Sequence, residues 1–412
     1  MSIINFRNWY IVSLFGFLMV ALLGTTMRYK IDFELPMLHQ KSLQYAHSHF
    51  AFSGWVTQTL MLLLIRFLKT QKVNLNYNAY RFILYANIIS SVALLFSFVF
   101  TGYSLLSVLI STITLIVFFV FCFRFWIDSK TISENNTSLS WFKHGLVFYM
   151  LSTLGSAYIA NMMITKSFHQ DWYLSSMYWY LHFQYNGWFF FAIVGVFLSL
   201  FSFSAIQKKQ MKLIRNLFVY SCYAGYALSV LWLKLPSFIF ILSIVASIVQ
   251  VIAWVLFVKL ILNNKSVVIQ GQPKSIQFIF FLLAFFITIK IALQAASNIP
   301  YLSHLAFGYR SVVIAYLHLI LLSIVSVFLL LAPFLIKLFD NFDKIYKPTI
   351  FTIVAIYINQ MLLGLQALGA ISFTLFPTIP LAFPQITLAL LFIAVVILFL
   401  TINLIVQYFR ST

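Results

Sequence analysis

The chain has 412 residues, of which 63% are hydrophobic, 19% aromatic and only 8% charged. A soluble globular domain carries about a quarter charged residues, so this composition excludes that class and indicates a polytopic membrane protein. The net charge of +19 would suggest nucleic-acid binding in a soluble protein, but the basic residues lie in short loops between apolar runs. There they act as topology signals for a protein in a lipid bilayer, and nucleic acid is not an expected partner.

Apolar runs of roughly 20 residues, the length that crosses a bilayer, divide the chain into about twelve predicted transmembrane helices. The polar stretches between them are short, so residues 1–412 are expected to form one all-α transmembrane helical domain, a polytopic membrane bundle. We find no convincing internal repeat and no cleavable signal peptide. The predicted spans lie near residues 8–28, 46–67, 80–101, 103–126, 141–163, 178–205, 213–233, 236–262, 275–297, 308–337, 347–371 and 382–408.

The 26 Lys and Arg residues are distributed unevenly between the two sides of these spans. Most lie in the even-numbered connections and at the two ends of the chain, as Arg7, the pair Lys208 and Lys209, and Arg410 illustrate. By the positive-inside rule these segments are cytoplasmic. Both termini are therefore predicted to be cytoplasmic, which agrees with an even number of spans.

Two histidines, His47 and His49, stand two residues apart at the start of the second predicted span. Residues at i and i+2 of a helix point about 200° apart, so the two rings are expected to face different neighbours. Imidazole is a common metal ligand, and an ionisable group in a membrane span indicates a functional site. The alternative is a pair of interfacial histidines hydrated by headgroup water.

With the predicted orientation, all 8 histidines except His144 lie toward the outer face. His182 opens the sixth span, and His318 lies deepest, within the tenth. A single histidine on an apolar helix often only forms a hydrogen bond to a neighbouring backbone or hydroxyl group, which is the alternative for His318. Several span histidines gathered toward one leaflet favour a shared function.

The 7 acidic residues all lie in loops or at loop edges, so no carboxylate is expected at mid-membrane for a calcium or magnesium site or for an acidic proton relay. Cys122 and Cys222 lie in apolar runs without CxxC spacing and predict neither a disulfide nor a metal site. Imidazole without carboxylate or thiolate suits haem iron or copper. The acidic residues are Asp32, Glu34, Asp128, Glu134, Asp171, Asp340 and Asp343.

Three runs resemble segments of the haem-copper oxidase superfamily, which includes cytochrome oxidase subunit I and the catalytic subunits of nitric oxide reductases. Residues 47–55 (HSHFAFSGW) are similar to its HxHxxxxG signature, although that form is more typical of the tenth helix than of the second. Residues 179–188 (WYLHFQYNGW) resemble the sixth-helix segment, in which a histidine binds the active-site copper or non-haem iron. Residues 315–319 (AYLHL) fall where the tenth helix holds haem ligands.

The resemblance implies a haem-copper oxidase subunit I-like fold in a bacterial inner membrane, with haem as cofactor and copper as a second metal. It also implies an electron donor, either cytochrome c or a quinol, and further membrane subunits as partners. An oxidoreductase-like activity is the corresponding expectation.

This chain departs from the family pattern at the second metal site. The seventh predicted span lacks the paired histidines, and Asn186 stands where the reductases carry a glutamate and the oxidases a tyrosine. Since His182 alone does not hold a copper ion, a complete oxygen-reducing site is not expected. No catalytic residue is assigned.

By the family's bridge between its second and tenth helices, His47 and His318 are the predicted axial ligands of one low-spin haem. His49, on the other side of its helix, is a candidate to bind a second metal together with His182. Arg310 and Lys290 are candidates to bind the haem propionates. The alternatives are an interfacial anchor for Arg310 and, for Lys290, a side chain that extends outward to water.

The leading hypothesis is therefore a haem-binding membrane protein that acts in electron transfer or in the handling of a diatomic gas or a metal. A transporter or permease, whose histidines contact a substrate or a copper ion, is the second hypothesis. A purely structural membrane subunit is the third, and it leaves the grouping of the span histidines unexplained.

Overall fold

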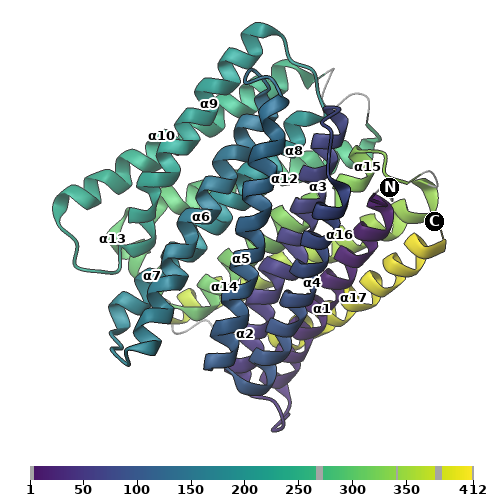
Figure 1. Ribbon diagram of the computed structural model, residues 1–412. Helices are drawn as coiled ribbons and strands as arrows, with labels where there is room; N and C mark the ends of the chain where they lie inside the picture. Colours follow the sequence, from purple (N-terminus) through teal and green to yellow (C-terminus); the bar gives the residue numbers. More distant parts are fainter. Residues whose placement is uncertain (1–3, 266–271, 340–341, 376–382, 411–412) are drawn as a thin grey trace. The chain divides into compact units, whose positions relative to one another are not determined.

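The computed structural model describes residues 4–265, 272–339, 342–375 and 383–410, so Asp340 and residue 382, where the twelfth predicted span begins, lie outside the described residues. Within these ranges every regular element is a helix and none is a strand (Figure 1). The prediction of an all-α membrane protein is confirmed.

Eleven helices in the described part of the chain are long and apolar enough to cross a membrane, against about twelve predicted spans. The difference arises at the seventh predicted run, 213–233. Its residues form the second half of α9 (Ala205–Ala224) and the short 3₁₀-helix η4 (Gly225–Val230). Lys208, Lys209, Lys212 and Arg215 of α9 lower its mean hydropathy, so α9 is not among the eleven.

The helices belong to two compact units, Met1–Ile132 with Ser326–Thr412 (unit 1) and Ser133–Val325 (unit 2). Unit 1 holds α1 (Phe6–Asp32), α2 (Gln40–Phe50), η1 (Ala51–Thr57), α3 (Gln58–Thr70), α4 (Tyr77–Thr101), α5 (Leu105–Asp128), η2 (Ser129–Thr131), α15 (Val327–Leu335), α16 (Phe342–Leu375) and α17 (Phe383–Arg410). Unit 2 holds α6 (Thr137–Ile164), α7 (Gln170–His182), η3 (Phe183–Phe189), α8 (Phe190–Ser199), α9, η4, α10 (Ser237–Asn263), α12 (Lys274–Ala296), α13 (Pro300–Gly308), α14 (Arg310–His318) and η5 (Leu319–Ser326), whose last residue opens the second segment of unit 1.

Polar residues fix where several helices begin. The Asn5 side chain accepts hydrogen bonds from the backbone N–H groups of Arg7 and Asn8, and Ser104 and Ser204 each form a capping box. Such caps satisfy backbone N–H groups that have no partner inside the helix. They separate consecutive apolar runs into distinct helices.

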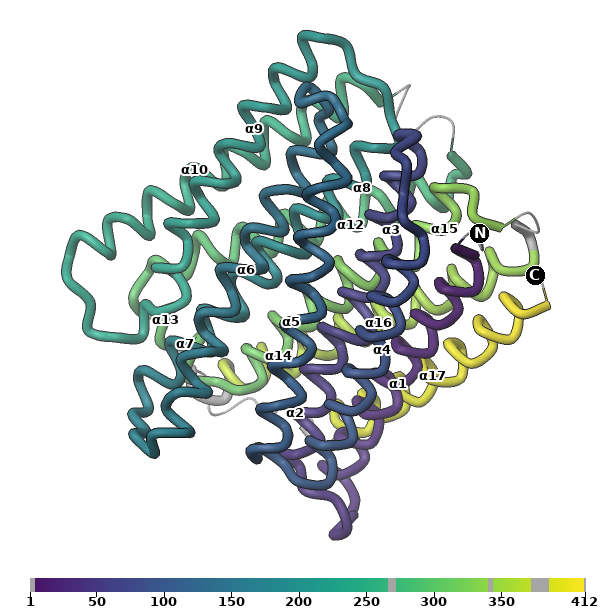
Figure 2. The backbone as a smooth tube through the Cα atoms, viewed as in Figure 1, coloured from purple at the N-terminus to yellow at the C-terminus, as the bar shows by residue number. Residues whose placement is uncertain are grey.

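In unit 1 the first and last helices pack side by side. The rings of Tyr10 on α1 and Tyr408 on α17 have their centroids 5.5 Å apart, so the start of α1 lies beside the end of α17 (Figure 2). Helices α1 and α17 therefore run antiparallel, and both ends of the described chain lie at the same end of unit 1. Further along α1, a Cβ added to Gly16 would overlap the carbonyl of Gly54 in η1, so the two backbones are in direct contact.

In unit 2 glycines bring α6 against the helix formed by α7, η3 and α8. A Cβ at Gly187 would overlap the Phe148 ring, and one at Gly145 would lie 3.3 Å from Trp188. Around these contacts lies an aromatic core that includes Trp141, Phe148, Phe183, Phe191 and Phe218.

Helix α5 carries an exposed apolar stripe, as expected for a helix that faces lipid. On α5, large apolar side chains that are at least half exposed recur at a spacing of three to four residues, which places them on one face. Contact with a lipid bilayer explains such a stripe. The residues are Leu105, Leu109, Ile113, Ile116, Val120 and Phe123.

We predict that Gly16→Ala lowers the free energy of unfolding by about 1–3 kcal/mol, because the added methyl group meets the rigid backbone of Gly54. Gly364→Ala on α16 is the matched control, since nothing lies within 4 Å of its added Cβ. Gly364→Ala should raise the free energy of unfolding by about 0.5–1 kcal/mol, because alanine is favoured over glycine inside a helix. Thermal unfolding in detergent compares the two, and equal effects would contradict the close contact.

Candidate functional site

Three π-helical segments, η1, η3 and η5, begin within two residues after a histidine: His49, His182 and His318. A π-helix accounts for well under about 1% of residues in globular proteins and is frequent at functional sites. The spans that contain these segments are also the most buried, with 83%, 78% and 56% of their most apolar windows buried. The histidines therefore lie on the central helices.

Two of these segments share a short sequence motif. Residues 49–55 (HFAFSGW) and 182–188 (HFQYNGW) have the same His, Phe, Gly and Trp, with an aromatic residue between them. Trp55 and Trp188 are fully buried in both copies. This local repeat was detectable in the sequence, but it covers only seven residues and is lost in a comparison of whole spans.

The ring of His47 is held by the backbone of α1. Its Nδ1 lies 3.1 Å from the carbonyl oxygen of Val20, and a Cβ added to Gly24 would lie 3.3 Å from its Cε1. A carbonyl oxygen can only accept a hydrogen bond, so Nδ1 carries the proton. In the neutral ring the lone pair is then on Nε2.

His318 has the same tautomer. Its Nδ1 lies 2.9 Å from the carbonyl oxygen of Ile314, one turn earlier in α14, so Nδ1 again donates. Both rings are half-buried. Metal-binding histidines usually donate their other N–H to a backbone carbonyl, a carboxylate or water, which is the arrangement that His47 and His318 share.

His49 faces a different neighbour. Its ring stacks on Phe98 of α4, with centroids 4.7 Å apart and planes inclined by 28°. Since His47 contacts α1, the predicted divergence of the two side chains is confirmed.

His182 has the opposite tautomer and is 2% exposed. Its Nε2 lies 2.8 Å from the carbonyl oxygen of Cys222 and so donates, which leaves Nδ1 as an acceptor. Asn186 Nδ2 donates to that Nδ1 over 3.1 Å, and the Ser229 hydroxyl lies 3.4 Å away. Both ring nitrogens are thus used inside unit 2, where His182 connects α7, η3 and the end of α9.

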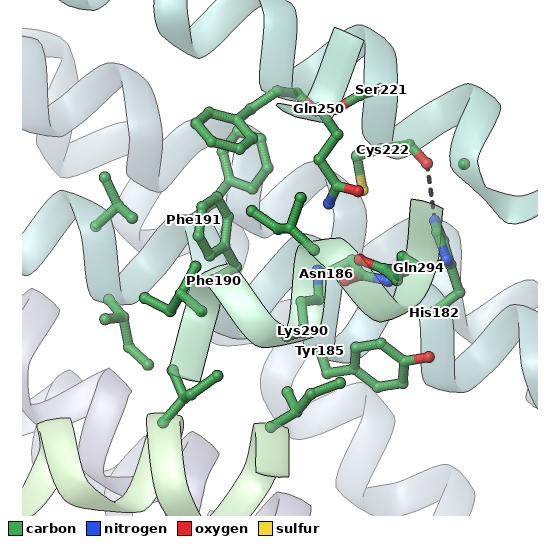
Figure 3. A pocket seen from close by; sticks show the side chains of 18 of the residues that line it. His182, Tyr185, Asn186, Phe190, Phe191, Ser221, Cys222, Gln250, Lys290 and Gln294 are labelled. Atoms are coloured by element: carbon green, nitrogen blue, oxygen red, sulfur yellow. Dashed lines mark hydrogen bonds between the residues drawn. The ribbon is translucent and has the colours of Figure 1, made fainter. Parts of the chain in front are cut away.

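A cavity opens beside this histidine within unit 2 (Figure 3). His182, Asn186, Lys290 and Gln294 contribute to its wall, together with apolar side chains from α9 and η5. Lys290 is therefore a buried cavity residue, whereas Arg310, the other candidate for the propionates, is exposed at the start of α14.

No three His, Cys, Asp or Glu side chains gather into a metal site among the residues that the structure describes. A haem iron with two axial histidines does not require such a group, so this finding does not bear on His47 and His318. No protein-family model matches the chain, and no curated protein is significantly similar to it.

We predict that His182→Leu lowers the free energy of unfolding by about 2–4 kcal/mol, because the Cys222 carbonyl and the Asn186 amide each lose a buried partner. The control His304→Leu changes an exposed histidine of unit 2 and should stay within about 0.5 kcal/mol of the wild type. Reversible chemical unfolding in detergent measures both variants. A wild-type stability for His182→Leu contradicts the structural role.

Proposed function

We propose that this membrane protein binds haem, with Nε2 of His47 and Nε2 of His318 as the candidate axial ligands, and that it acts in electron transfer or in the handling of a diatomic gas or a metal. The observation that carries the proposal is the shared tautomer, in which a backbone carbonyl accepts the Nδ1 proton and Nε2 keeps the lone pair. The ligand set came from the resemblance, and the tautomers supply an independent physical reason for it.

The placement of each ring also supports the proposal. Both histidines lie in spans that are among the most buried, and a π-helical segment begins directly after His318 and four residues after His47. An extra residue in a helical turn widens the backbone and re-aims the neighbouring side chains. Such segments are suited to positioning a ligand ring against a large planar cofactor.

A bound haem supplies one-electron redox chemistry. The residues of this chain set its surroundings: the Val20 and Ile314 carbonyls fix the orientation of the two rings and raise the electron density on Nε2. Arg310, exposed at the start of α14, is the remaining candidate for a propionate.

The same reasoning argues against a copper ion at His182. Its Nε2 proton and its Nδ1 lone pair are both engaged by buried partners, so coordination would break a hydrogen bond. The proposed activity is therefore limited to one haem and does not include a complete oxygen-reducing centre.

The decisive test is a reduced-minus-oxidised visible spectrum of the purified protein with a pyridine haemochrome assay. We expect a low-spin α-band near one haem per chain. Loss of an outer-shell partner already lowers metal affinity by roughly 10–100-fold, so loss of a ligand in His47→Ala or His318→Ala should remove most of the haem. Added imidazole should restore part of the α-band.

His144→Ala is the matched control. Like His318, His144 donates through Nδ1 to a carbonyl one turn earlier, that of Ser140 at 2.7 Å, but it lies inside the continuous α-helix α6 and is not a proposed ligand. It should keep full haem content. Full occupancy in both ligand variants contradicts the assignment, and a colourless wild type from cells supplied with iron and haem precursor would favour the permease hypothesis.

A further inference from the structure

The cavity of unit 2 combines an apolar wall with buried polar side chains that have unused hydrogen-bonding atoms. Asn186, Lys290 and Gln294 are 5%, 8% and 8% exposed, and all three line the cavity (Figure 3). Buried polar groups are normally paired, and each exception calls for an explanation. A ligand that occupies the cavity is one explanation that can be tested.

The hydrogen bonds around His182 fix how Asn186 is oriented. Since His182 Nε2 donates to the Cys222 carbonyl, its Nδ1 must accept, and only the NH₂ group of Asn186 can donate to it. Asn186 Oδ1 therefore points away from His182 and has no hydrogen-bond partner. It is a buried acceptor that requires a donor.

Lys290 and Gln294 lie one turn apart on α12, on the same face. The Lys290 ammonium forms no hydrogen bond or ion pair with a described residue, and Gln294 Oε1 is a second buried acceptor without a partner. None of the described residues that line the cavity is acidic. A buried ammonium group without a partner is strongly disfavoured, so the Lys290 amine is either neutral or accompanied by an anion.

These atoms define a ligand with complementary chemistry. A negative charge on the ligand would stabilise the protonated form of Lys290, and an O–H group on it would donate to Asn186 Oδ1 or Gln294 Oε1. We propose that this cavity binds a small monovalent oxyanion that retains an O–H group, the class of hydrogencarbonate and dihydrogenphosphate.

The size of the cavity agrees with such a ligand. The cavity offers about 60 Å³ to the centres of water molecules. Since one water requires about 10–15 Å³ measured in this way, the space holds roughly four to six waters. A small oxyanion fits, whereas a nucleotide or a sugar phosphate is too large.

The test is the melting temperature of the purified full-length protein, titrated with sodium hydrogencarbonate or sodium phosphate at constant ionic strength. We expect a saturable rise of at least about 2 °C for these anions. Sodium nitrate has the same charge but no O–H group, and its half-saturating concentration should be at least tenfold higher. Sodium chloride controls for ionic strength.

Two variants at Lys290 test whether the rise in melting temperature comes from an anion bound in the cavity. Lys290→Met should fold, because it replaces an uncompensated buried ammonium by an apolar chain of similar length, and it should abolish the rise. Lys290→Gln, which stays polar, should abolish it as well. Lys234→Met is the matched control, since Lys234 is an exposed lysine of unit 2, and it should keep the wild-type response.

Three results would overturn the proposal: no saturable rise in the wild type, the same rise in Lys290→Met or Lys290→Gln, or equal responses to hydrogencarbonate, nitrate and chloride. The measurement does not depend on haem, so it separates this site from the one proposed for His47 and His318. It can be made on apoprotein and on haem-loaded protein alike.

Discussion

A hydrogen bond from an imidazole N–H to a backbone carbonyl holds His47, His182 and His318 in place, and the ring nitrogen that donates it differs among them. Where Nδ1 donates, Nε2 keeps the lone pair and the ring is suited to a metal. Where Nε2 donates, as in His182, Nδ1 becomes the acceptor for Asn186. In unit 2, the tautomer of His182 fixes the orientation of Asn186, whose side chain lines the cavity.

The π-helical segments leave some backbone groups without their usual hydrogen-bond partners. An i→i+5 pattern disturbs the ordinary i→i+4 bonds, so side chains must satisfy some of the displaced backbone groups. In η1, Asn87 Nδ2 donates to the Ser53 carbonyl over 3.1 Å. A separate side-chain bond, from Trp55 Nε1 to the Ser326 hydroxyl over 2.9 Å, holds the indole ring. These bonds explain why Asn87 and Ser326 are buried polar residues.

Much of the fold was predictable from the sequence, because apolar runs long enough to cross a bilayer have few other interpretations. The divergence of His47 and His49 followed from helical geometry alone. The seventh predicted span differs from the others, since its apolar residues continue a basic helix and end in a 3₁₀-helix, a break that the apolar run 213–233 does not reveal. The π-helical segments and the cavity-facing position of Lys290 were also missed. They depend on contacts between helices far apart in the chain.

His49, His182 and His318 lie at nearly equal intervals along the chain, and a π-helical segment begins within two residues after each of them. The wider turns of a π-helical segment put the helix before it out of register with the helix after it. In each of these spans, residues on the two sides of the segment therefore face different neighbours from those that an unbroken α-helix would give them.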